Sequence, residues 1–363
     1  MIHILFVDDE PDLLSGLRRG LRSQRKLWNM HFAVGGKEAL SKVAEIDFDL
    51  VITDMRMPEM NGATLLEKVY EVAPHTIRVL LSGQSDKEST LQAIGISHQF
   101  WAKPFDTEAM ITKIEELVSV RNRLKKVEWY AINAMHSIPS PAPVLNSLKT
   151  ELLQSSPDIN VISEIVGSDV GLSSKLVQLT NSAYFGTGNT ILVPGDAVRF
   201  LGVDLMQELI KLNGFSSVVD TESTPLALGT LEKISEAADL GENVGLKIGM
   251  EKRDWSLARQ VCKFFMLGSA LKDTGIIVSN TEEFAVDDGQ YLAALWGFPS
   301  QLYDLLSIDS IKKGGDLSDF SRAVLAIVFP EFSNSLSPDD DPHLVMFKRE
   351  IEAVRATAKG TSS

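Results

Sequence analysis

Cysteine is almost absent from this chain of 363 residues, which contains only Cys262. A lone cysteine cannot form an internal disulfide or a cysteine-built zinc site, and this usage is typical of a reducing compartment. Long hydrophobic runs are also missing, because stretches such as DLVITDM (49–55) are far shorter than the roughly 20 residues of a membrane helix. The start, MIHILFVDDE, lacks the basic and apolar regions of an export signal. We therefore expect a cytoplasmic protein without a membrane span.

Excess positive charge is lacking in both halves of the chain. The net charge is −14, with 13 basic and 18 acidic residues in 1–120 and 22 basic and 31 acidic residues in the remainder. Nucleic-acid binding draws much of its affinity from clustered Lys and Arg, so we expect no nucleic-acid partner. The one basic cluster, RNRLKK (121–126), is typical of a solvated helix face.

The residues that are present predict a globular protein of two domains. The chain is 44% hydrophobic and 23% charged, and its length exceeds that of most single cores. In the first 120 residues, short β-like runs alternate with stretches of helical period. These runs are HILFV (3–7), MHFAV (30–34), DLVIT (49–53), RVLLS (78–82) and QFWAK (99–103). Such alternation predicts an α/β domain in which helices cover both faces of a parallel sheet.

The segment from 107 to 137 has apolar residues at near-heptad spacing, at 111, 114, 117, 118, 120, 124 and 127. This pattern fits either one long helix, useful for homodimerisation, or a last domain helix followed by a connector. The proline-rich SIPSPAPVL (137–145) must interrupt a helix. Beyond it, apolar spacing of three and four predicts an all-α domain, with Asp158 capping one helix. We expect domains at 1–120 and 138–335, a connecting helix or linker at 121–137, and a partly flexible tail at 336–363.

Acidic and polar residues follow the expected strands, where the loops of a parallel sheet converge. Asp8 and Asp9 follow the first strand, Asp54 the third, Ser82 the fourth and Lys103 the fifth. Clustered carboxylates repel one another and need a cation, and a hard ion such as Mg²⁺ prefers oxygen ligands. This set suits attack of a carboxylate on phosphorus, with Lys103 stabilising the charged oxygens. A cis bond between Lys103 and Pro104 would direct the ammonium inward.

Residues 1 to about 120 resemble the receiver domain of two-component response regulators. The resemblance rests on FVDDE (6–10), VITDMRMPEMNG (51–62), LLSG (80–83) and WAKPF (101–105). It implies a flavodoxin-like, doubly wound five-stranded sheet of order 2-1-3-4-5 and phosphorylation by a histidine kinase or phosphotransfer protein. It assigns Asp54 as phosphoacceptor, Ser82 and Lys103 as phosphoryl contacts, Phe100 as the switch aromatic, and Asp8, Asp9, Asp54 and the carbonyl of Arg56 as ligands of Mg²⁺ or Mn²⁺. Pro58 and Gly62 fit the loop after Asp54, where we expect glycine to adopt a positive φ.

The second domain resembles the HDOD output domain, a helical relative of the HD phosphohydrolases that is regarded as non-catalytic. The resemblance rests on IPSPAPVLNSL, IVGSDVGLSSKLVQLTNSAYFG and PGDAVRFLGVDLMQELI, within 138–210. Asp169-Val170 departs from the usual Asp-Pro, and the resemblance weakens after about residue 212. Asn181 and Ser182, followed by Tyr184 and Phe185, fit a helix end with an aromatic plug better than a ligand contact. The resemblance implies an output through an unidentified protein partner, without a cofactor.

An active HD enzyme carries a metal-binding His-Asp pair together with further histidines. The stretch LGSALKDTG (267–275) offers Lys272 and Asp273 at that place, and no histidine lies between 137 and 342. A lysine ammonium has no lone pair for a metal. We therefore expect no enzyme activity in the output domain. The disfavoured alternatives are a metal-dependent cyclic-dinucleotide phosphodiesterase and a DNA-binding transcriptional regulator, and a cleft that binds a small ligand stays open.

Overall fold

The N-terminal part of the chain forms a five-stranded parallel sheet. The structure is a computed structural model that describes residues 1–83, 93–135, 137–138, 140–182, 185, 190–211, 218–219, 225–273, 286–298, 300–306, 321, 324, 349 and 352. The strands are β1 (Ile2–Asp8), β2 (Trp28–Val34), β3 (Leu50–Asp54), β4 (Ile77–Ser82) and β5 (Gln99–Ala102). Their order is β2-β1-β3-β4-β5 and each neighbouring pair is parallel. The predicted flavodoxin-like order is confirmed.

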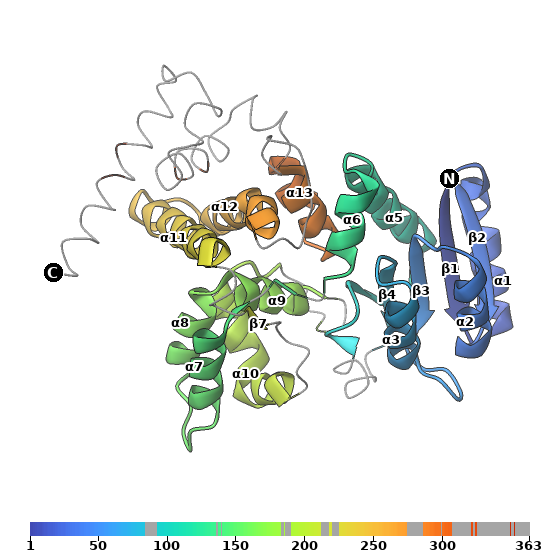
Figure 1. The fold of residues 1–363 in the computed structure, drawn as a ribbon, viewed down its shortest axis with the longest axis horizontal. Coiled ribbons are helices and arrows are strands. Elements are labelled where there is room, and N and C mark those ends of the chain that lie inside the picture. The colour runs from blue at the N-terminus through green and yellow to red at the C-terminus, as the bar shows by residue number, and fades with distance from the viewer. Residues whose placement is uncertain are drawn as a thin grey trace.

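Helices connect these strands and cover the sheet (Figure 1). They are α1 (Pro11–Gly20), the 3₁₀ helix η1 (Leu21–Lys26), α2 (Gly36–Glu45), α3 (Gly62–Val72) and α5 (Thr107–Arg121). The central strands β3 and β4 are buried along their whole length, as strands with helices on both faces must be. At the edges, β2 leaves several side chains partly exposed, whereas β5 borders the rest of the chain.

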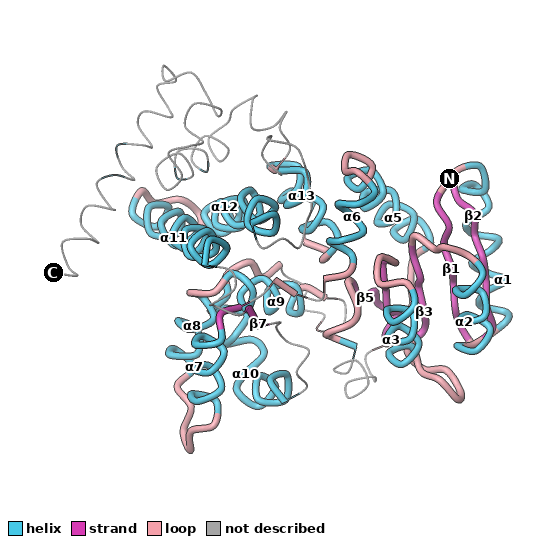
Figure 2. The backbone as a smooth tube through the Cα atoms, in the orientation of Figure 1, coloured by secondary structure: helices cyan, strands magenta, loops and turns pink. Residues whose placement is uncertain are grey.

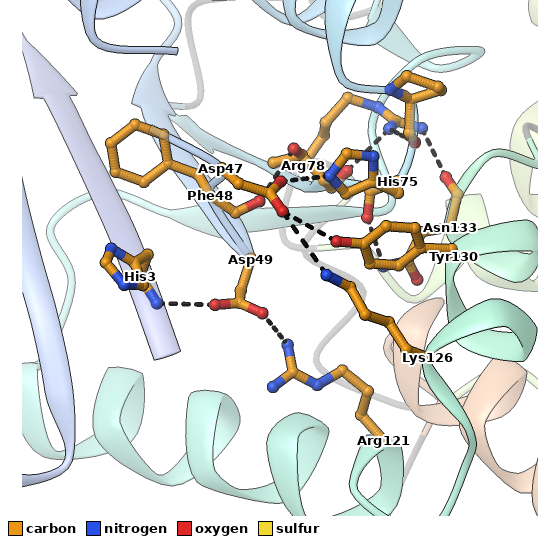
Figure 3. Close-up of polar contacts among 12 residues, drawn as sticks. His3, Asp47, Phe48, Asp49, His75, Arg78, Arg121, Lys126, Tyr130 and Asn133 are labelled. Atoms are coloured by element: carbon orange, nitrogen blue, oxygen red, sulfur yellow. Dashed lines mark hydrogen bonds and ion pairs between the residues drawn. The ribbon is translucent and has the colours of Figure 1, made fainter. Parts of the chain in front are cut away.

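The segment after α5 is not one long helix. Helix α5 ends at Arg121, and a separate helix α6 (Lys126–Asn133) begins after a short break. Figure 3 shows that α6 is bound to the receiver half of the molecule. Asp47 accepts a hydrogen bond of 3.0 Å from Tyr130 of α6 and contacts His75 at 2.5 Å. Of the two alternatives that the heptad-like spacing left open, the structure shows the last helix followed by a connector.

The C-terminal part is helical, as predicted (Figure 2). It contains α7 (Ala142–Leu152), α8 (Ile159–Gly167), α9 (Val170–Thr180), α10 (Pro194–Lys211), α11 (Pro225–Lys247), α12 (Lys252–Asp273), α13 (Val286–Leu295) and α14 (Ser300–Leu305). One addition is a short parallel pair, β6 (Ser140–Pro141) with β7 (Val218–Val219). Gly202 interrupts α10 with a φ of 75°, a conformation that glycine adopts without strain. In the part of the chain that the structure describes, no helix is long and apolar enough to cross a membrane.

Two predicted helix ends are confirmed. Asp158 caps α8 by accepting a hydrogen bond of 2.8 Å from the backbone N–H of Asn160. Asn181 ends α9, and its amide joins the helix to the chain ten residues later, because it donates to the carbonyl of Ile191 at 2.5 Å and accepts from the N–H of Ile191 at 2.8 Å. Phe185 packs edge-on against Phe200, with 6.1 Å between the ring centroids, whereas Tyr184 lies outside the described residues.

The two parts of the chain pack directly against each other. Helix α13 contacts both α5 and α6, so the helical half covers the receiver beside its β5 edge (Figure 1). Tyr291 of α13 is completely buried in this contact, and its hydroxyl donates to Asn133 of α6 at 2.6 Å. The helices α5 and α6 are therefore in direct contact with the helical half.

Candidate functional site

The carboxyl edge of the sheet brings together side chains from three strands. Asp8 is the last residue of β1, Asp54 the last of β3 and Ser82 the last of β4. The parallel register aligns these ends, and the backbone N–H of Lys103 donates to the carbonyl of Ser82 at 3.0 Å, which continues β5 to the same edge. The sequence prediction that these residues share one edge is therefore matched by the register.

Lys103 connects the two buried carboxylates. Its Nζ lies 2.5 Å from Oδ1 of Asp54 and 2.9 Å from Oδ2 of Asp8, and the peptide bond that follows it, to Pro104, is cis. Burial raises the pKa of Asp54, while the hydrogen bond and the charge of Lys103 oppose that rise. Burial also disfavours the Lys103 ammonium, but its bonds to Asp54 and Asp8 outweigh this effect and raise its pKa. For Asp54, the effect of burial on the pKa is the larger of the two.

The donor set at this edge fits a divalent cation. Asp8 and Asp54 are 1% and 7% exposed, and their two negative charges face a single ammonium, so one negative charge is left over. A hard cation prefers such carboxylate oxygens. Asp9 is partly exposed and is not grouped with the pair, since no three His, Cys, Asp or Glu side chains converge closely enough for a metal among the described residues. Arg56 donates its backbone N–H to Oδ2 of Asp54 at 2.9 Å, which fixes the loop beside it.

The two other predicted site residues, Ser82 and Phe100, lie in the neighbouring strands β4 and β5 of the same sheet. Ser82 is 5% exposed, and its hydroxyl donates to the carbonyl of Gly83 at 3.3 Å. Phe100 lies in β5, is 6% exposed and lines a cavity against the helical half. Its role as the switch aromatic stays a prediction.

The prediction of a positive φ at Gly62 is wrong. The positive φ in this loop belongs to Glu59, at 63°, while Gly62 begins α3 in ordinary helical geometry. Glycine is required at position 62 for another reason: a Cβ there would lie 2.2 Å from the backbone oxygen of Asp54. The N–H of Gly62 donates to the carbonyl of Met55 at 2.9 Å, so the start of α3 presses directly against the end of β3. Close approach, not backbone conformation, excludes a side chain.

Strand β5 also carries residues that join the two halves of the chain and that sequence reasoning missed. Gln99 donates from Nε2 to the carbonyls of Ala294 and Leu295, at 2.8 and 3.2 Å, at the C-terminal end of α13. Its Oε1 accepts from the indole N–H of Trp101 at 2.7 Å. From the other side, Gln178 of α9 donates to the carbonyl of His98 at 2.8 Å. Backbone carbonyls receive most of these bonds, so no pair of side-chain types in the sequence could have indicated them.

A second junction lies beside the first, at the start of β4, where Asn133 of α6 contacts three parts of the chain (Figure 3). Its Nδ2 donates to the carbonyl of His75 at 2.7 Å, its Oδ1 accepts from Tyr291 of α13, and its carbonyl accepts from Arg78 of β4 at 3.2 Å. Nearby, Asp49 accepts from Arg121 of α5 at 2.8 Å. The N-terminal half is thus attached to the helical half at the starts of β4 and β5, the end of the sheet opposite to Asp8, Asp54 and Ser82.

The core of the helical half contains charged groups that are paired with one another. Arg259 forms ion pairs with Asp239, at 2.7 Å, and with Glu242. The ammonium of Lys263 donates to the hydroxyl of Ser173 at 2.5 Å, and complete burial lowers its pKa to about 7. Of these two basic side chains of α12, Arg259 is thus paired with two partly exposed acids of α11, and Lys263 is bonded to a hydroxyl of α9.

The Lys272-Asp273 pair lies in the last turn of α12. The side chains of both residues are outside the described part of the structure, so the expectation that they replace a metal-binding pair stays a prediction. The acid that the structure does define is Asp169, in the motif Asp169-Val170. Asp169 caps α9 by accepting a hydrogen bond of 2.7 Å from the N–H of Leu172, and it accepts a second one of 2.6 Å from the hydroxyl of Ser140. Its contacts are therefore structural, since they join the start of α9 to β6.

Comparison with known proteins identifies two protein families along the chain. The sequence matches the family described as "Response regulator receiver domain" over residues 4–115 and the family described as "HDOD domain" over residues 138–267. Among curated proteins, it is 32% identical over 127 residues to the uncharacterized transcriptional regulatory protein YesN of Bacillus subtilis, which covers 34% of each chain. The chain thus spans only about a third of the length of this curated relative.

Two solved structures are similar to the same N-terminal part. One is an uncharacterized protein from Neptuniibacter caesariensis, at 32% identity, covering 34% of this chain and 97% of the other with a TM-score of 0.31. The other is the signal receiver domain of an HD domain-containing protein from Pseudomonas fluorescens Pf-5, at 28% identity, covering 34% and 98% with a TM-score of 0.32. With the family matches and the observed strand order, the chain belongs to the response regulators, with a receiver domain at 4–115 followed by an HDOD domain at 138–267.

Proposed function

We propose that Asp54 accepts a phosphoryl group from a histidine kinase or a phosphotransfer protein, and that this reaction controls an HDOD output that acts by binding another protein. The observation that carries the proposal is the buried carboxylate of Asp54, which lies 2.5 Å from the ammonium of Lys103 and shares it with Asp8. A phosphoacceptor must be a carboxylate that lies beside groups able to neutralise the incoming phosphoryl charge. The contact of Asp54 with Lys103 supports this role.

The chemistry assigns a separate task to each side chain. An oxygen of Asp54 forms a bond to phosphorus while the bond from phosphorus to the donor breaks, giving an acyl phosphate. Lys103 lies within hydrogen-bond distance of Asp54 and stabilises the negative oxygens of the transferred group. Asp8, Asp9, Asp54 and the carbonyl of Arg56 are the proposed ligands of Mg²⁺ or Mn²⁺, which when bound supplies further positive charge. Ser82 is the proposed hydroxyl contact of the phosphoryl group.

The test is labelling by a small acyl phosphate donor in the presence of Mg²⁺. We expect one phosphoryl group per chain, removed by hydroxylamine as an acyl phosphate would be, and located at position 54 by mass spectrometry after borohydride reduction. Chelation of the divalent cation by EDTA should stop labelling, because the leftover negative charge of Asp8 and Asp54 repels the donor. Labelling on another carboxylate, or equal labelling in EDTA, would refute the assignment.

The output is proposed to respond through β5. Phe100 directly follows His98 and Gln99 in the chain. The carbonyl of His98 accepts a hydrogen bond from α9, and the side chain of Gln99 donates to α13. A movement of Phe100 on phosphorylation would therefore displace atoms that hold the HDOD domain. Phosphorylation in this view shifts an equilibrium between a docked and a released arrangement, according to the contacts that each arrangement makes.

A Gln99→Leu variant is expected to loosen this contact. The substitution conserves volume but removes the N–H donor that satisfies two C-terminal carbonyls of α13. A lost hydrogen bond of about 1 kcal/mol corresponds to roughly a fivefold rise in amide exchange in the last turn of α13. Hydrogen exchange with mass spectrometry measures this rise. The Gln99→Leu substitution should also reduce the difference in α13 amide exchange between phosphorylated and unphosphorylated chains. Gln24→Leu, in η1, makes the same substitution away from α13 and should leave that exchange unchanged.

A protein partner for the HDOD domain is proposed. Arg259 forms ion pairs with Asp239 and Glu242 of α11, and Lys263 bonds to Ser173 of α9, so these basic side chains of α12 serve contacts within the domain. A pull-down from the native cell lysate, with the phosphorylated chain beside the Asp54→Asn variant, tests the proposal. Partners that differ between the two samples would support phosphorylation-controlled binding, and identical sets would contradict it. The cytoplasmic location and a homodimer remain expectations from the sequence.

A further inference from the structure

A cavity of about 330 Å³ lies between the receiver and the HDOD domain. Its receiver wall comes from β5 and α5, and its HDOD wall comes from the end of α9 and from the turn after α13. Small-molecule sites typically have volumes from about 300 to 1,000 Å³, so this cavity is large enough for a compact ligand. Because two domains form its walls, the cavity exists in this shape only when they are docked.

Four aromatic rings dominate the walls of this cavity: Phe100, Trp101, Trp296 and Phe298. Each of them is less than 10% exposed. The polar indole atom of Trp101 is engaged by Gln99, and the ring of Phe298 is fixed by an edge contact to Phe264, with 4.8 Å between centroids. The rings are therefore held in place, and aromatic walls of this kind favour a flat, unsaturated ligand.

One buried hydrogen-bond acceptor of a lining residue has no partner among the residues that the structure describes. Gln178 is 5% exposed and its Nε2 donates to the carbonyl of His98, which determines the orientation of the amide. Its Oε1 is buried and forms no hydrogen bond with the described part of the chain. An unsatisfied buried acceptor costs about 1–3 kcal/mol, so a ligand that presents an N–H group to Gln178 gains free energy.

The charges that line the cavity are balanced. Lys113 and Glu116 both line it from neighbouring positions of α5, and the ammonium of Lys113 lies 5.5 Å from the ring centroid of Trp101. A single pair of opposite charges does not select a strongly charged molecule. Glu116 contributes a polar side chain at the receiver side, and Asn181 and Ser182 contribute polar side chains at the HDOD side. The lining combines flat apolar walls, one acceptor for an N–H group and a polar border.

We propose that this interdomain cavity is a binding site for a nucleoside-type ligand, a neutral flat nitrogen heterocycle with an N–H donor and an attached sugar. The base lies between the aromatic rings and donates to Gln178, and the sugar hydroxyls lie toward Glu116 and Lys113. Since both domains contact the ligand, binding favours the docked arrangement over the released one. The site is independent of Asp54 and does not require phosphorylation.

The test is titration of the full-length, unphosphorylated chain with adenosine, guanosine, cytidine and uridine. Trp101 and Trp296 lie in the walls, so tryptophan fluorescence and calorimetry both report binding. We expect at least one nucleoside to saturate with a dissociation constant below about 1 mM. The Asp54→Asn variant should bind equally well, which separates this site from the proposed phosphorylation. If none of the four nucleosides shows saturable binding, the proposal is overturned.

Three variants identify the contact. Gln178→Met removes the acceptor and should weaken binding about tenfold, as the loss of roughly 1.4 kcal/mol implies. Gln178→Glu keeps an acceptor but loses the bond to His98, and should still bind. Arg123→Met removes another interdomain hydrogen bond, to Gln290, outside the cavity, and should change affinity by less than about twofold. Equal losses in Gln178→Met and Arg123→Met would show that docking alone matters and would refute the contact.

A filling variant provides an independent control. Ser182→Phe places a large ring in the lining at a position that is partly buried and whose hydroxyl bonds only to the carbonyl of Leu179 among the described contacts. It should abolish nucleoside binding while labelling with a phosphodonor continues at the wild-type rate. Binding that persists in this variant would place the ligand elsewhere and contradict the proposal.

Discussion

An Asp54→Asn variant is expected to take up no phosphoryl group and, in the absence of divalent cations, to be more stable than the wild-type chain. The first effect follows because an amide nitrogen or oxygen does not attack phosphorus as a carboxylate does. The second follows because the native state holds two buried carboxylates against one ammonium, at 2.5 and 2.9 Å. Burial already raises the pKa of Asp54, which means that its charged form is disfavoured by the fold.

Removal of that charge leaves Asp8 and Lys103 as a balanced pair. We expect the free energy of unfolding of the receiver to increase by about 1–2 kcal/mol, since one uncompensated buried charge disappears. Hydrogen exchange of peptides from β3 across a urea series measures this change within the full chain. In saturating Mg²⁺ the gain should shrink, because the cation stabilises the wild-type carboxylates and has a weaker set of ligands in the variant.

A matched control is Asp12→Asn, which removes an exposed acid in the first turn of α1. It should leave labelling unchanged and shift stability by less than about 0.5 kcal/mol, as is usual for surface positions. An Asp54→Asn variant that is less stable than the wild type in EDTA would show that Asp54 and Lys103 contribute a net favourable pair. Such a result would remove the electrostatic argument for a cation site while leaving the loss of labelling to be judged by itself.

The receiver half could be predicted almost completely from sequence because its signals are local and regular. Strand-sized apolar runs alternate with helical stretches, and the reactive residues follow those runs directly, so a parallel sheet must bring Asp8, Asp54 and Ser82 to one edge. The error at Gly62 arose because the requirement there is a distance between two segments, the start of α3 and the end of β3. A pattern in one segment cannot express that distance.

The contacts between the two halves could not be predicted for the same reason. Gln99 bonds to α13, nearly 200 residues later in the chain, and its acceptors are backbone carbonyls that every residue possesses. The heptad-like spacing did not indicate that α6 is a separate helix. The residues that attach α6 to the receiver, such as Asp47 and Tyr130, are ordinary polar residues without a recognisable pattern. Tertiary contacts decide such cases, and the sequence indicates only that apolar faces need partners.

Arg78→Met is expected to be the most destabilising single substitution considered for the receiver. Arg78 lies at the start of β4 and is completely buried, with no exposed surface. Its guanidinium donates to four backbone carbonyls, those of Pro74, Thr76, Ile96 and Asn133, and also contacts the ring of His98 at 3.2 Å. Burial lowers its pKa to about 9, so it remains charged at neutral pH and its bonds are charge-assisted.

Methionine has similar bulk and fills the space without any donor, so the substitution leaves several buried carbonyls without a partner. Each costs about 1–3 kcal/mol, and with partial relaxation we expect a loss of about 3–5 kcal/mol in the free energy of unfolding. Because one of these carbonyls belongs to Asn133 of α6, exchange of α6 amides should rise together with that of β4. Hydrogen exchange of both elements across a urea series measures the two effects in the full chain.

Two companion variants decide the cause of the loss. Arg22→Met, which removes an exposed arginine of η1, should change stability by less than about 0.5 kcal/mol. Arg78→Lys keeps the charge but offers three donors from one nitrogen, which cannot reach carbonyls on several sides, so its stability should lie between the wild type and Arg78→Met. If Arg78→Lys is as stable as the wild type, the forked hydrogen bonds are unimportant. If α6 keeps wild-type exchange while β4 loosens, the receiver and the connector are not joined through Arg78 and Asn133, and the mechanical link from the sheet to the HDOD domain must run through β5 alone.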